Sequence, residues 1–224
     1  MSSKRKCSPL SSIGKKQIMG ATGLLLCGFL VTHFVGNCTL FLGPAAFNKY
    51  SHALTSNPLI YLAEAALLGL FLAHILMAIK LVIENKKARP VEYHTYIKSG
   101  RGGTFASKTM PYTGIIALVF LVIHILGLKF GTQYSTTIDG IEMRDIYKTT
   151  IEYFQDPLHI VFYIISMIAL GIHTSHGFWS AFQSLGLSHP KYMPKIQLAS
   201  KLFGLFVVIG FSSLPIFCYL QGGH

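Results

Sequence analysis

Long apolar stretches dominate the chain and alternate with shorter polar segments. Five of the stretches are long enough to cross the hydrocarbon layer of a membrane, which takes about 20 mostly apolar residues in a helix. They cover residues 17–43, 58–83, 110–130, 157–182 and 199–220. Pro58, Pro111 and Pro157 are each expected in a first helical turn, where the missing N–H costs nothing. The pattern predicts an all-α integral membrane protein, a bundle of five transmembrane helices that forms a single membrane domain over residues 1–224.

The composition agrees with a membrane protein and excludes several other classes. Of the 224 residues, 51% are hydrophobic and 12% are charged, whereas soluble domains carry about 25% charged residues. The four cysteines lie far apart, without a CxxC pair. This spacing excludes a zinc finger, a thioredoxin-type motif and covalently attached haem.

Basic residues gather on one side of the predicted membrane. Of the 19 lysines and arginines, 15 lie at the N-terminus, in the loops after the second and fourth spans, or at the adjoining helix ends, whereas five of the eight acidic residues lie on the other side. Positive charge marks the cytoplasmic side of a membrane protein. The N-terminus is therefore expected in the cytoplasm and the C-terminus outside. This distribution accounts for the net charge of +11, so membrane lipid and a cytoplasmic protein are expected as partners, and nucleic acid is not.

Histidines occur at regular depths within the first four spans. These spans contain His33, His74, His124 and the two neighbours His173 and His176, although an ionisable side chain inside a membrane is costly and usually functional. The first member in each span lies 16 or 17 residues after a polar residue that precedes the span, about 25 Å along a helix. Successive helices start from opposite sides, so His33 and His124 are expected toward the outer surface and His74 and His173 toward the cytoplasm.

Two imidazoles that face each other across a helical bundle can bind one haem iron axially. Two pairs at two depths therefore predict two stacked haems and an electron path across the membrane. Histidines that only pack, a proton relay and a zinc site are the alternatives; zinc would need its ligands to converge on one point. Small residues in the same spans would let a flat macrocycle approach, although they also serve ordinary helix packing: Gly23, Gly28, Gly36, Gly69, Ala73, Ala78, Gly171 and Gly177.

Two segments resemble motifs of a known family. These are MGATGLLLCGFLVTHFVGN at Met19 to Asn37 and HTSHGFWSAFQSLG at His173 to Gly186. They are similar to the first and fourth helices of the dihaem cytochrome b anchor of succinate:quinone oxidoreductases, the succinate dehydrogenase and fumarate reductase family with one five-helix anchor subunit. The resemblance covers all five spans. It implies two haems b, the inner one bound by His74 and His173 and the outer one by His33 and His124. The motif favours His173 over His176, which would pack, bond a haem propionate or face a partner.

The resemblance also implies a function. The chain would be the membrane anchor and electron-transfer subunit of the enzyme, in the bacterial cytoplasmic membrane. It would carry electrons between an iron–sulfur subunit on the cytoplasmic face and a quinone, menaquinone in this class. A flavoprotein subunit would perform the dicarboxylate chemistry, since this chain has no GxGxxG fingerprint and no cysteine cluster. A dihaem cytochrome b of a hydrogenase or formate dehydrogenase, a haem-free transporter with a histidine relay, and a purely structural anchor are the alternatives.

Glu64 is the one carboxylate well inside a span. It lies ten residues before His74, about 15 Å outward of it along the helix and near the depth of the outer haem. It is a candidate proton acceptor or relay for a quinone, or else a glutamate hydrogen-bonded to a neighbouring helix at the lipid interface. Some relatives carry a second glutamate two residues before the fourth ligand, where this chain has Gly171. Four basic residues are candidate partners of the inner haem propionates: Lys86, Lys87, Arg101 and Lys108.

Overall fold

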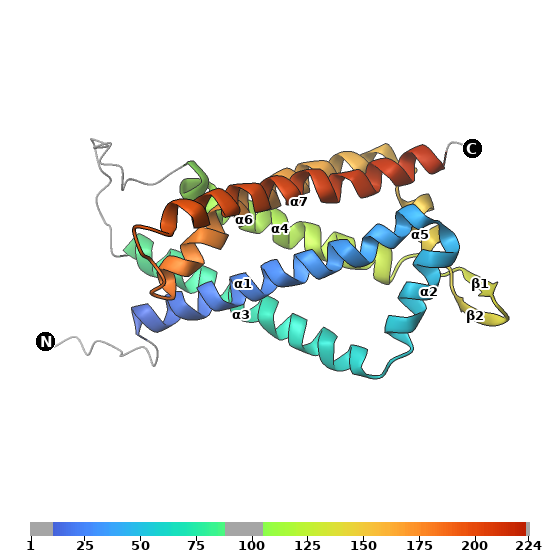
Figure 1. Cartoon of the computed structure of the whole chain (residues 1–224), viewed down its shortest axis with the longest axis horizontal. Helices are drawn as coiled ribbons and strands as arrows, with labels where there is room; N and C mark the ends of the chain where they lie inside the picture. Colours follow the sequence, from blue (N-terminus) through green and yellow to red (C-terminus); the bar gives the residue numbers. More distant parts are fainter. Residues whose placement is uncertain (1–10, 88–104, 223–224) are drawn as a thin grey trace, which may run out of the picture.

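The computed structural model describes residues 11–87 and 105–222, most of which are helical. The elements follow in the order α1 (Ser12–Asn37), η1 (Cys38–Leu42), α2 (Pro44–Thr55), α3 (Leu59–Lys87), α4 (Phe105–His124), η2 (Ile125–Lys129), β1 (Ser135–Ile138), β2 (Ile141–Arg144), α5 (Ile146–Tyr153), α6 (Pro157–Ser184) and α7 (Met193–Gln221). The long helices form an elongated bundle (Figure 1). The end at which α1 starts is called the N-terminal end below, and the opposite end, with α2, β1, β2 and α5, is called the hairpin end.

Five helical segments in the described part of the chain are long and apolar enough to cross a membrane, which confirms the predicted fold class. They are Ser12–Leu42, Leu59–Lys87, Lys108–Lys129, Pro157–Ser184 and Met193–Gln221. Pro157 does lie in the first turn of α6, where the Asp156 carboxylate accepts from Leu158 N at 2.9 Å. The expectation for Pro111 was wrong, because α4 begins at Phe105 and the proline lies inside it. The apolar pattern predicted the start of the helix at the rise in hydropathy, whereas α4 begins several residues earlier, in a more polar segment.

An ordered cap covers the hairpin end, where the sequence indicated only loops. Strands β1 and β2 pair antiparallel around Asp139 and Gly140, which have positive φ angles of 53° and 77°. Asp-Gly is a preferred dipeptide for such a two-residue turn, so the sequence does contain a local signal for the hairpin. Asn48 of α2 is 1% exposed; it donates to the Asp145 carboxylate at 2.9 Å and accepts from Tyr147 N at 2.9 Å. These bonds join α2 to the start of α5.

The packed core of the described residues lies at the same end and between α6 and α7. A cluster of buried side chains joins the cap to the two helices: Leu40, Phe47, Phe154, Tyr163, Leu214 and Cys218. Further along, α6 and α7 approach backbone to backbone, since a Cβ atom at Gly171 would lie 2.7 Å from Gly204 O. A glutamate in place of Gly171 would force the two helices apart here.

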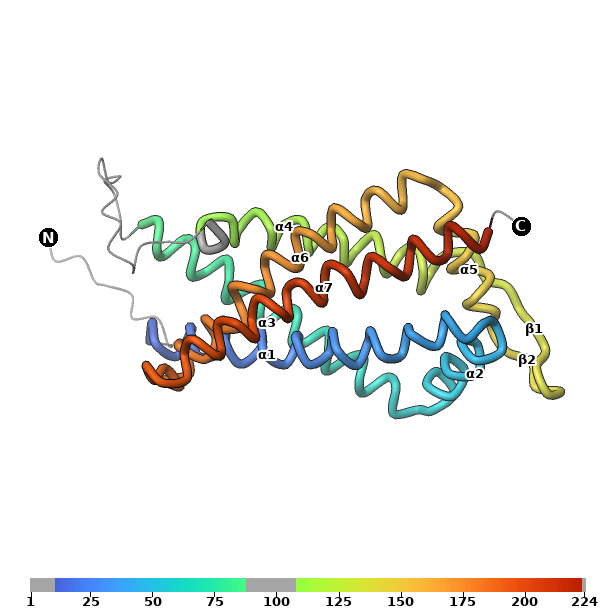
Figure 2. Tube along the Cα trace, turned by 45° about the horizontal axis from the view of Figure 1, so that its top comes forward, coloured from blue at the N-terminus to red at the C-terminus, as the bar shows by residue number. Residues whose placement is uncertain are grey.

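Helix α3 has the least protein contact of the long helices. None of its residues is buried, and Leu62 and Leu76 are 69% and 59% exposed. It crosses α1 and diverges from it toward the hairpin end (Figure 2). At the N-terminal end Lys15 Nζ of α1 lies 2.5 Å from Glu84 Oε1 of α3, although the Lys15 side chain is only 3% exposed. This ion pair fixes one end of α3.

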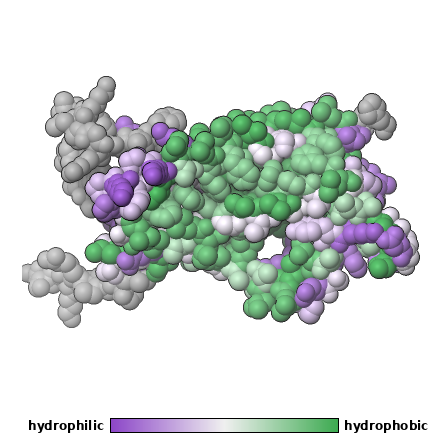
Figure 3. Space-filling model, in the orientation of Figure 1, coloured by the Kyte–Doolittle hydropathy of each residue, from purple (hydrophilic) through white to green (hydrophobic). Residues whose placement is uncertain are grey.

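The molecular surface is apolar around the middle and polar toward both ends (Figure 3). Figure 3 also shows an opening bordered by α1, α2 and the outer part of α3. Outward-facing leucines along α3 would be costly in water and fit a lipid environment. The chain is a multi-pass membrane protein.

Candidate functional site

The four histidines meet in two pairs, one at each of two levels. At the level nearer the N-terminal end, the rings of His74 (α3) and His173 (α6) have centroids 6.3 Å apart and an interplanar angle of 69°. At the level nearer the hairpin end, His33 (α1) and His124 (α4) have centroids 5.9 Å apart at 86°. These are the pairs that the depth arithmetic predicted. The rotation of the helices, which the sequence did not define, directs the members of each pair toward each other.

The separation of the rings suits a shared metal ion. A metal–imidazole bond is about 2.0–2.1 Å long, so two rings that bind one ion from opposite sides have centroids about 6 Å apart. Both pairs are near this value. Within the part of the chain that the structure describes, no three His, Cys, Asp or Glu side chains converge. Each level therefore offers two facing imidazoles from the described residues, the type of ligand that a haem iron binds axially.

Three of the four rings have a hydroxyl partner at Nδ1. Thr22 Oγ1 lies 3.1 Å from His74, Thr113 Oγ1 lies 3.2 Å from His173, and Tyr163 Oη lies 3.2 Å from His124. At His33 the Asn37 amide lies 3.4 Å from both ring nitrogens, which indicates an amide beside the ring and no directed bond. Sequence reasoning did not find these partners.

Aromatic rings enclose His33 and His124, which are called the outer pair below, whereas His74 and His173 are called the inner pair. Phe29 stacks on His33 with centroids 5.2 Å apart at 20°, and Phe120 stacks on His124 at 5.4 Å and 30°. Phe211 of α7 stacks on His33 at 6.1 Å and 21°. The outer pair thus lies in an apolar environment that α7 helps to form, although α7 contributes no histidine.

His176 does not join either pair. Its ring contacts Trp179 at 5.1 Å and 81°, and its Nδ1 is buried without a hydrogen-bond partner among the described residues. His173, three residues earlier, is the residue that faces His74. The buried nitrogen of His176 is available to a bound polar group.

Glu64 is engaged in an ion pair. Its Oε1 lies 2.5 Å from Nζ of Lys129, and both side chains are nearly half exposed. Lys129 ends η2, five residues after His124, so the ion pair connects α3 to the end of α4 on the outer side of the outer pair. The sequence identified Glu64 but not its partner.

The turn after His124 has an unusual backbone. Residues Ile125–Lys129 form a π-helix that continues α4 directly after the histidine. Arg144 of β2 holds the end of this turn: its two terminal nitrogens donate to Lys129 O at 3.0 Å and to Leu128 O at 2.8 Å. π-Helical turns occur frequently at functional sites, and this one directly follows the candidate ligand His124.

The small residues divide into two groups. A Cβ atom at Gly28, Gly69 or Gly177 would meet no atom within 4 Å, whereas one at Gly23 would meet the His74 ring and one at Gly171 would meet α7. The first group borders open space, and Gly28 and Gly69 are exposed. The second group serves close contacts within the protein.

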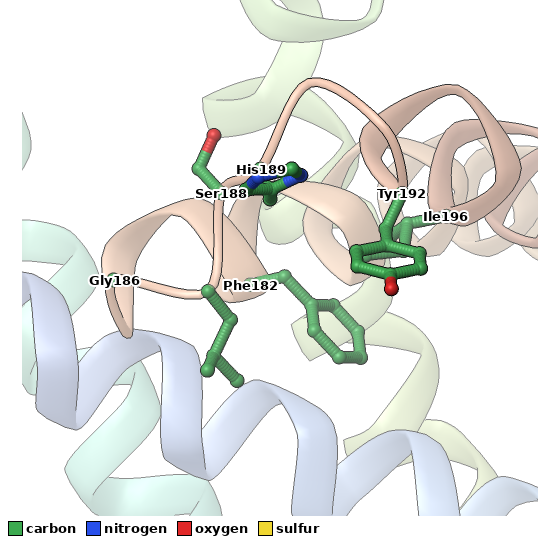
Figure 4. Close-up of a pocket in the computed structure, with 7 residues that line it drawn as sticks. Phe182, Gly186, Ser188, His189, Tyr192 and Ile196 are labelled. Atoms are coloured by element: carbon green, nitrogen blue, oxygen red, sulfur yellow. The ribbon is translucent and has the colours of Figure 1, made fainter.

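A surface hollow lies away from the histidine pairs. It has a volume of about 510 Å³ at the N-terminal end, where α6 turns into α7 (Figure 4). Its lining is mostly apolar: Phe182, Gly186, Leu187, Ser188, His189, Tyr192 and Ile196. None of the four paired histidines lines it.

Other sequence expectations have mixed outcomes. Arg101, a candidate propionate partner, lies outside the described residues. His159, in the first turn of α6, stacks on Tyr153 at 3.9 Å and 6°, with its Nδ1 2.7 Å from Tyr153 O. The Asp156 cap starts α6 close to the end of α5 and brings these rings together.

One known protein matches most of the chain. The succinate dehydrogenase cytochrome b558 subunit of Bacillus subtilis is 24% identical over 185 residues, which cover 82% of this chain and 83% of that protein. The resemblance seen in the two motifs is confirmed. No family model and no solved structure matches. The matched protein is neither a hydrogenase nor a formate dehydrogenase subunit nor a transporter, so the alternatives from the sequence are not favoured.

Proposed function

We propose that this chain is the electron-carrying membrane anchor of a succinate:quinone oxidoreductase and holds two haems b. The observation that carries the proposal is the pair of facing imidazoles at each of two levels. The similarity to a succinate dehydrogenase cytochrome b subunit supports the same assignment. His74 and His173 would hold the inner haem, and His33 and His124 the outer one. When bound, each haem supplies the transfer of single electrons.

The other residues of the site bind, orient and exclude water. The stacked Phe29, Phe120 and Phe211 keep water away from the outer pair, and a dry environment strengthens every electrostatic interaction within it. The orphaned Nδ1 of His176 would donate a hydrogen bond to a propionate of the inner haem. The positive-inside rule places the N-terminal end in the cytoplasm, where a flavoprotein and an iron–sulfur subunit would attach in a bacterial cytoplasmic membrane.

The decisive experiment measures haem in the purified complex and in single variants. Two b-type haems per chain are expected. His33→Ala or His124→Ala should remove only the outer haem, and His74→Ala or His173→Ala only the inner one, because each level loses one of two axial ligands. His176→Ala on α6 should keep both haems, because His176 belongs to neither facing pair; the loss of its propionate contact would change the potential of the inner haem and not its occupancy. A folded, iron-replete preparation without haem would contradict the proposal.

Glu64 would serve a quinone, for which we propose menaquinone, on the outer side of the outer pair. To accept a proton, its carboxylate must exchange the Lys129 ammonium for a hydroxyl of the reduced quinone, the quinol, a short displacement for two half-exposed side chains. Glu64→Gln should keep both haems and slow quinone turnover at least about tenfold, the usual range for loss of a general base being 10²–10⁴.

Lys129→Met is the control that separates this role from a structural one. It breaks the same ion pair but leaves the carboxylate, so it should retain quinone turnover. Equal turnover in the two variants would assign Glu64 to helix packing alone.

A further inference from the structure

Helices α1 and α4 carry two copies of one sequence pattern. Residues 22–33 read TGLLLCGFLVTH and residues 113–124 read TGIIALVFLVIH, with six of twelve positions identical. Threonine and glycine open each copy, and histidine closes it eleven residues after the threonine. Eleven residues are about three helical turns, so the threonine and the histidine lie on one face at two depths.

Matched residues of the two copies have matched contacts at the outer level. The phenylalanine at the eighth position stacks on the histidine four residues later in both, as described above for Phe29 and Phe120. The two closing histidines, His33 and His124, face each other. The repeat is therefore structural as well as sequential.

The opening threonines have matched contacts at the inner level. Thr22 lies 3.1 Å from Nδ1 of His74, which belongs to the neighbouring α3, and Thr113 lies 3.2 Å from Nδ1 of His173, which belongs to α6. Both threonines are nearly buried, at 7% and 6% exposure. Each copy thus contributes its own histidine to the outer pair and contacts a histidine of the inner pair on another helix.

The glycines that follow the threonines leave room for the inner rings. A Cβ atom at Gly23 would lie 3.3 Å from Cε1 of His74, and one at Gly114 would lie 3.4 Å from Cε1 of His173. Both distances are at the tight limit of real Cβ contacts. Threonine and glycine together form a seat for one imidazole.

The hydrogen bonds of the threonines define the tautomer of the seated rings. Thr22 Oγ1 donates to Ile18 O at 2.8 Å, and Thr113 Oγ1 donates to Thr109 O at 3.1 Å. A hydroxyl has one hydrogen. Because the carbonyl takes it, the oxygen can only accept from the ring, so Nδ1 carries the proton and Nε2 keeps a free lone pair.

We propose that Thr22 and Thr113 are positioning residues for the inner haem, each orienting one axial histidine and presenting its unprotonated Nε2 to the iron. This inference rests on the proposed function. An acceptor at Nδ1–H makes an imidazole a stronger donor to its metal, which stabilises ferric iron. The two threonines therefore lower the potential of the inner haem relative to the same site without them.

The test is a redox titration and electron paramagnetic resonance of the complete complex with Thr22→Val or Thr113→Val. Valine keeps the shape and removes the acceptor. We expect the midpoint potential and the low-spin signal of the inner haem to shift, the potential upward, with the outer haem unchanged. Thr22→Ser restores a hydroxyl and should return both toward the wild-type values. Loss of the inner haem alone from a valine variant would also support the seat.

Thr32→Val is the matched control, since the Thr32 hydroxyl on the same helix donates to Phe29 O at 3.0 Å. An unchanged inner haem in both valine variants would overturn the proposal, as would an equal shift in the Thr32 control. Loss of both haems together would do the same, because a defect in one seat cannot empty the other level. Failure of the proposed function has a different signature: wild-type protein without haem, or an inner haem that survives His74→Ala.

Discussion

At the residue scale, the sequence predicted the depth of each histidine but not the hydrogen-bond partners of its ring. The rise of a helix converts sequence distance into depth, so the assignment of His33 with His124 and of His74 with His173 needed only the spans and their alternating direction. The partners at Nδ1 come from other helices, 39 to 60 residues away in the chain. No local pattern defines them. The exception is the Thr-Gly repeat, which marks the two threonines as equivalent positions on α1 and α4.

Tyr163 provides a residue-level prediction for the outer pair. Its hydroxyl lies 3.2 Å from Nδ1 of His124, and its side chain is 5% exposed. Tyr163→Phe removes this hydrogen bond, a change of about 0.5–1.5 kcal/mol, and keeps the ring in the core. In the proposed arrangement the spectrum and potential of the outer haem should shift and those of the inner haem should not. Redox titration of the complex measures both, and a shift confined to the inner haem would contradict the arrangement.

At the element scale, the structure differs from the sequence prediction mainly at the ends of the helices. The predicted spans ended where hydropathy fell, but α4 continues as a π-helix after His124. The polar segment that follows folds into a hairpin, and Arg144 of this hairpin donates hydrogen bonds to the end of the π-helix. A π-helical turn bonds each residue to the fifth one along instead of the fourth, so it changes the direction in which the following residues leave the helix. The orientation of such a turn therefore depends on the residue that binds its end. Arg144 is that residue.

Arg144→Ala should loosen the π-helical turn. Two backbone carbonyls lose charge-assisted donors, at a cost of about 1–3 kcal/mol each, so α4 should fray toward His124. We expect a lower occupancy of the outer haem and a lower melting temperature, with the inner haem retained. Lys148→Ala is the control, since that lysine lies on the same cap and its ammonium is 3.8 Å from Glu152 at the surface. Full outer-haem occupancy in Arg144→Ala would show that the turn holds without its cap.

At the scale of the whole molecule, charge and helix number together predict the orientation in the membrane. Helix α1 begins and helix α7 ends at opposite ends of the bundle (Figure 1), and most lysines and arginines of the described residues belong to the N-terminal end. A fluorescent protein fused to the N-terminus should therefore fluoresce in the cytoplasm. Alkaline phosphatase fused to the C-terminus should be active outside. Activity of a phosphatase fused to the N-terminus would indicate the opposite orientation, in which His74 and His173 lie toward the outside and His33 and His124 toward the cytoplasm.

The sequence by itself determined the class of the protein, the number of its spans and the depth of its candidate ligands. These properties depend on hydrophobicity, on helical rise and on the distribution of charge, all of which are local or additive along the chain. The spans are apolar on all sides, so the sequence carried little information about which face of each helix turns inward. Only the tertiary structure decided the facing of the rings, the seats at Thr22 and Thr113, and the ion pair of Glu64 with Lys129. Helix rotation arises from close packing between helices, as at Gly171 and Gly204, and that packing exists only after the helices have met.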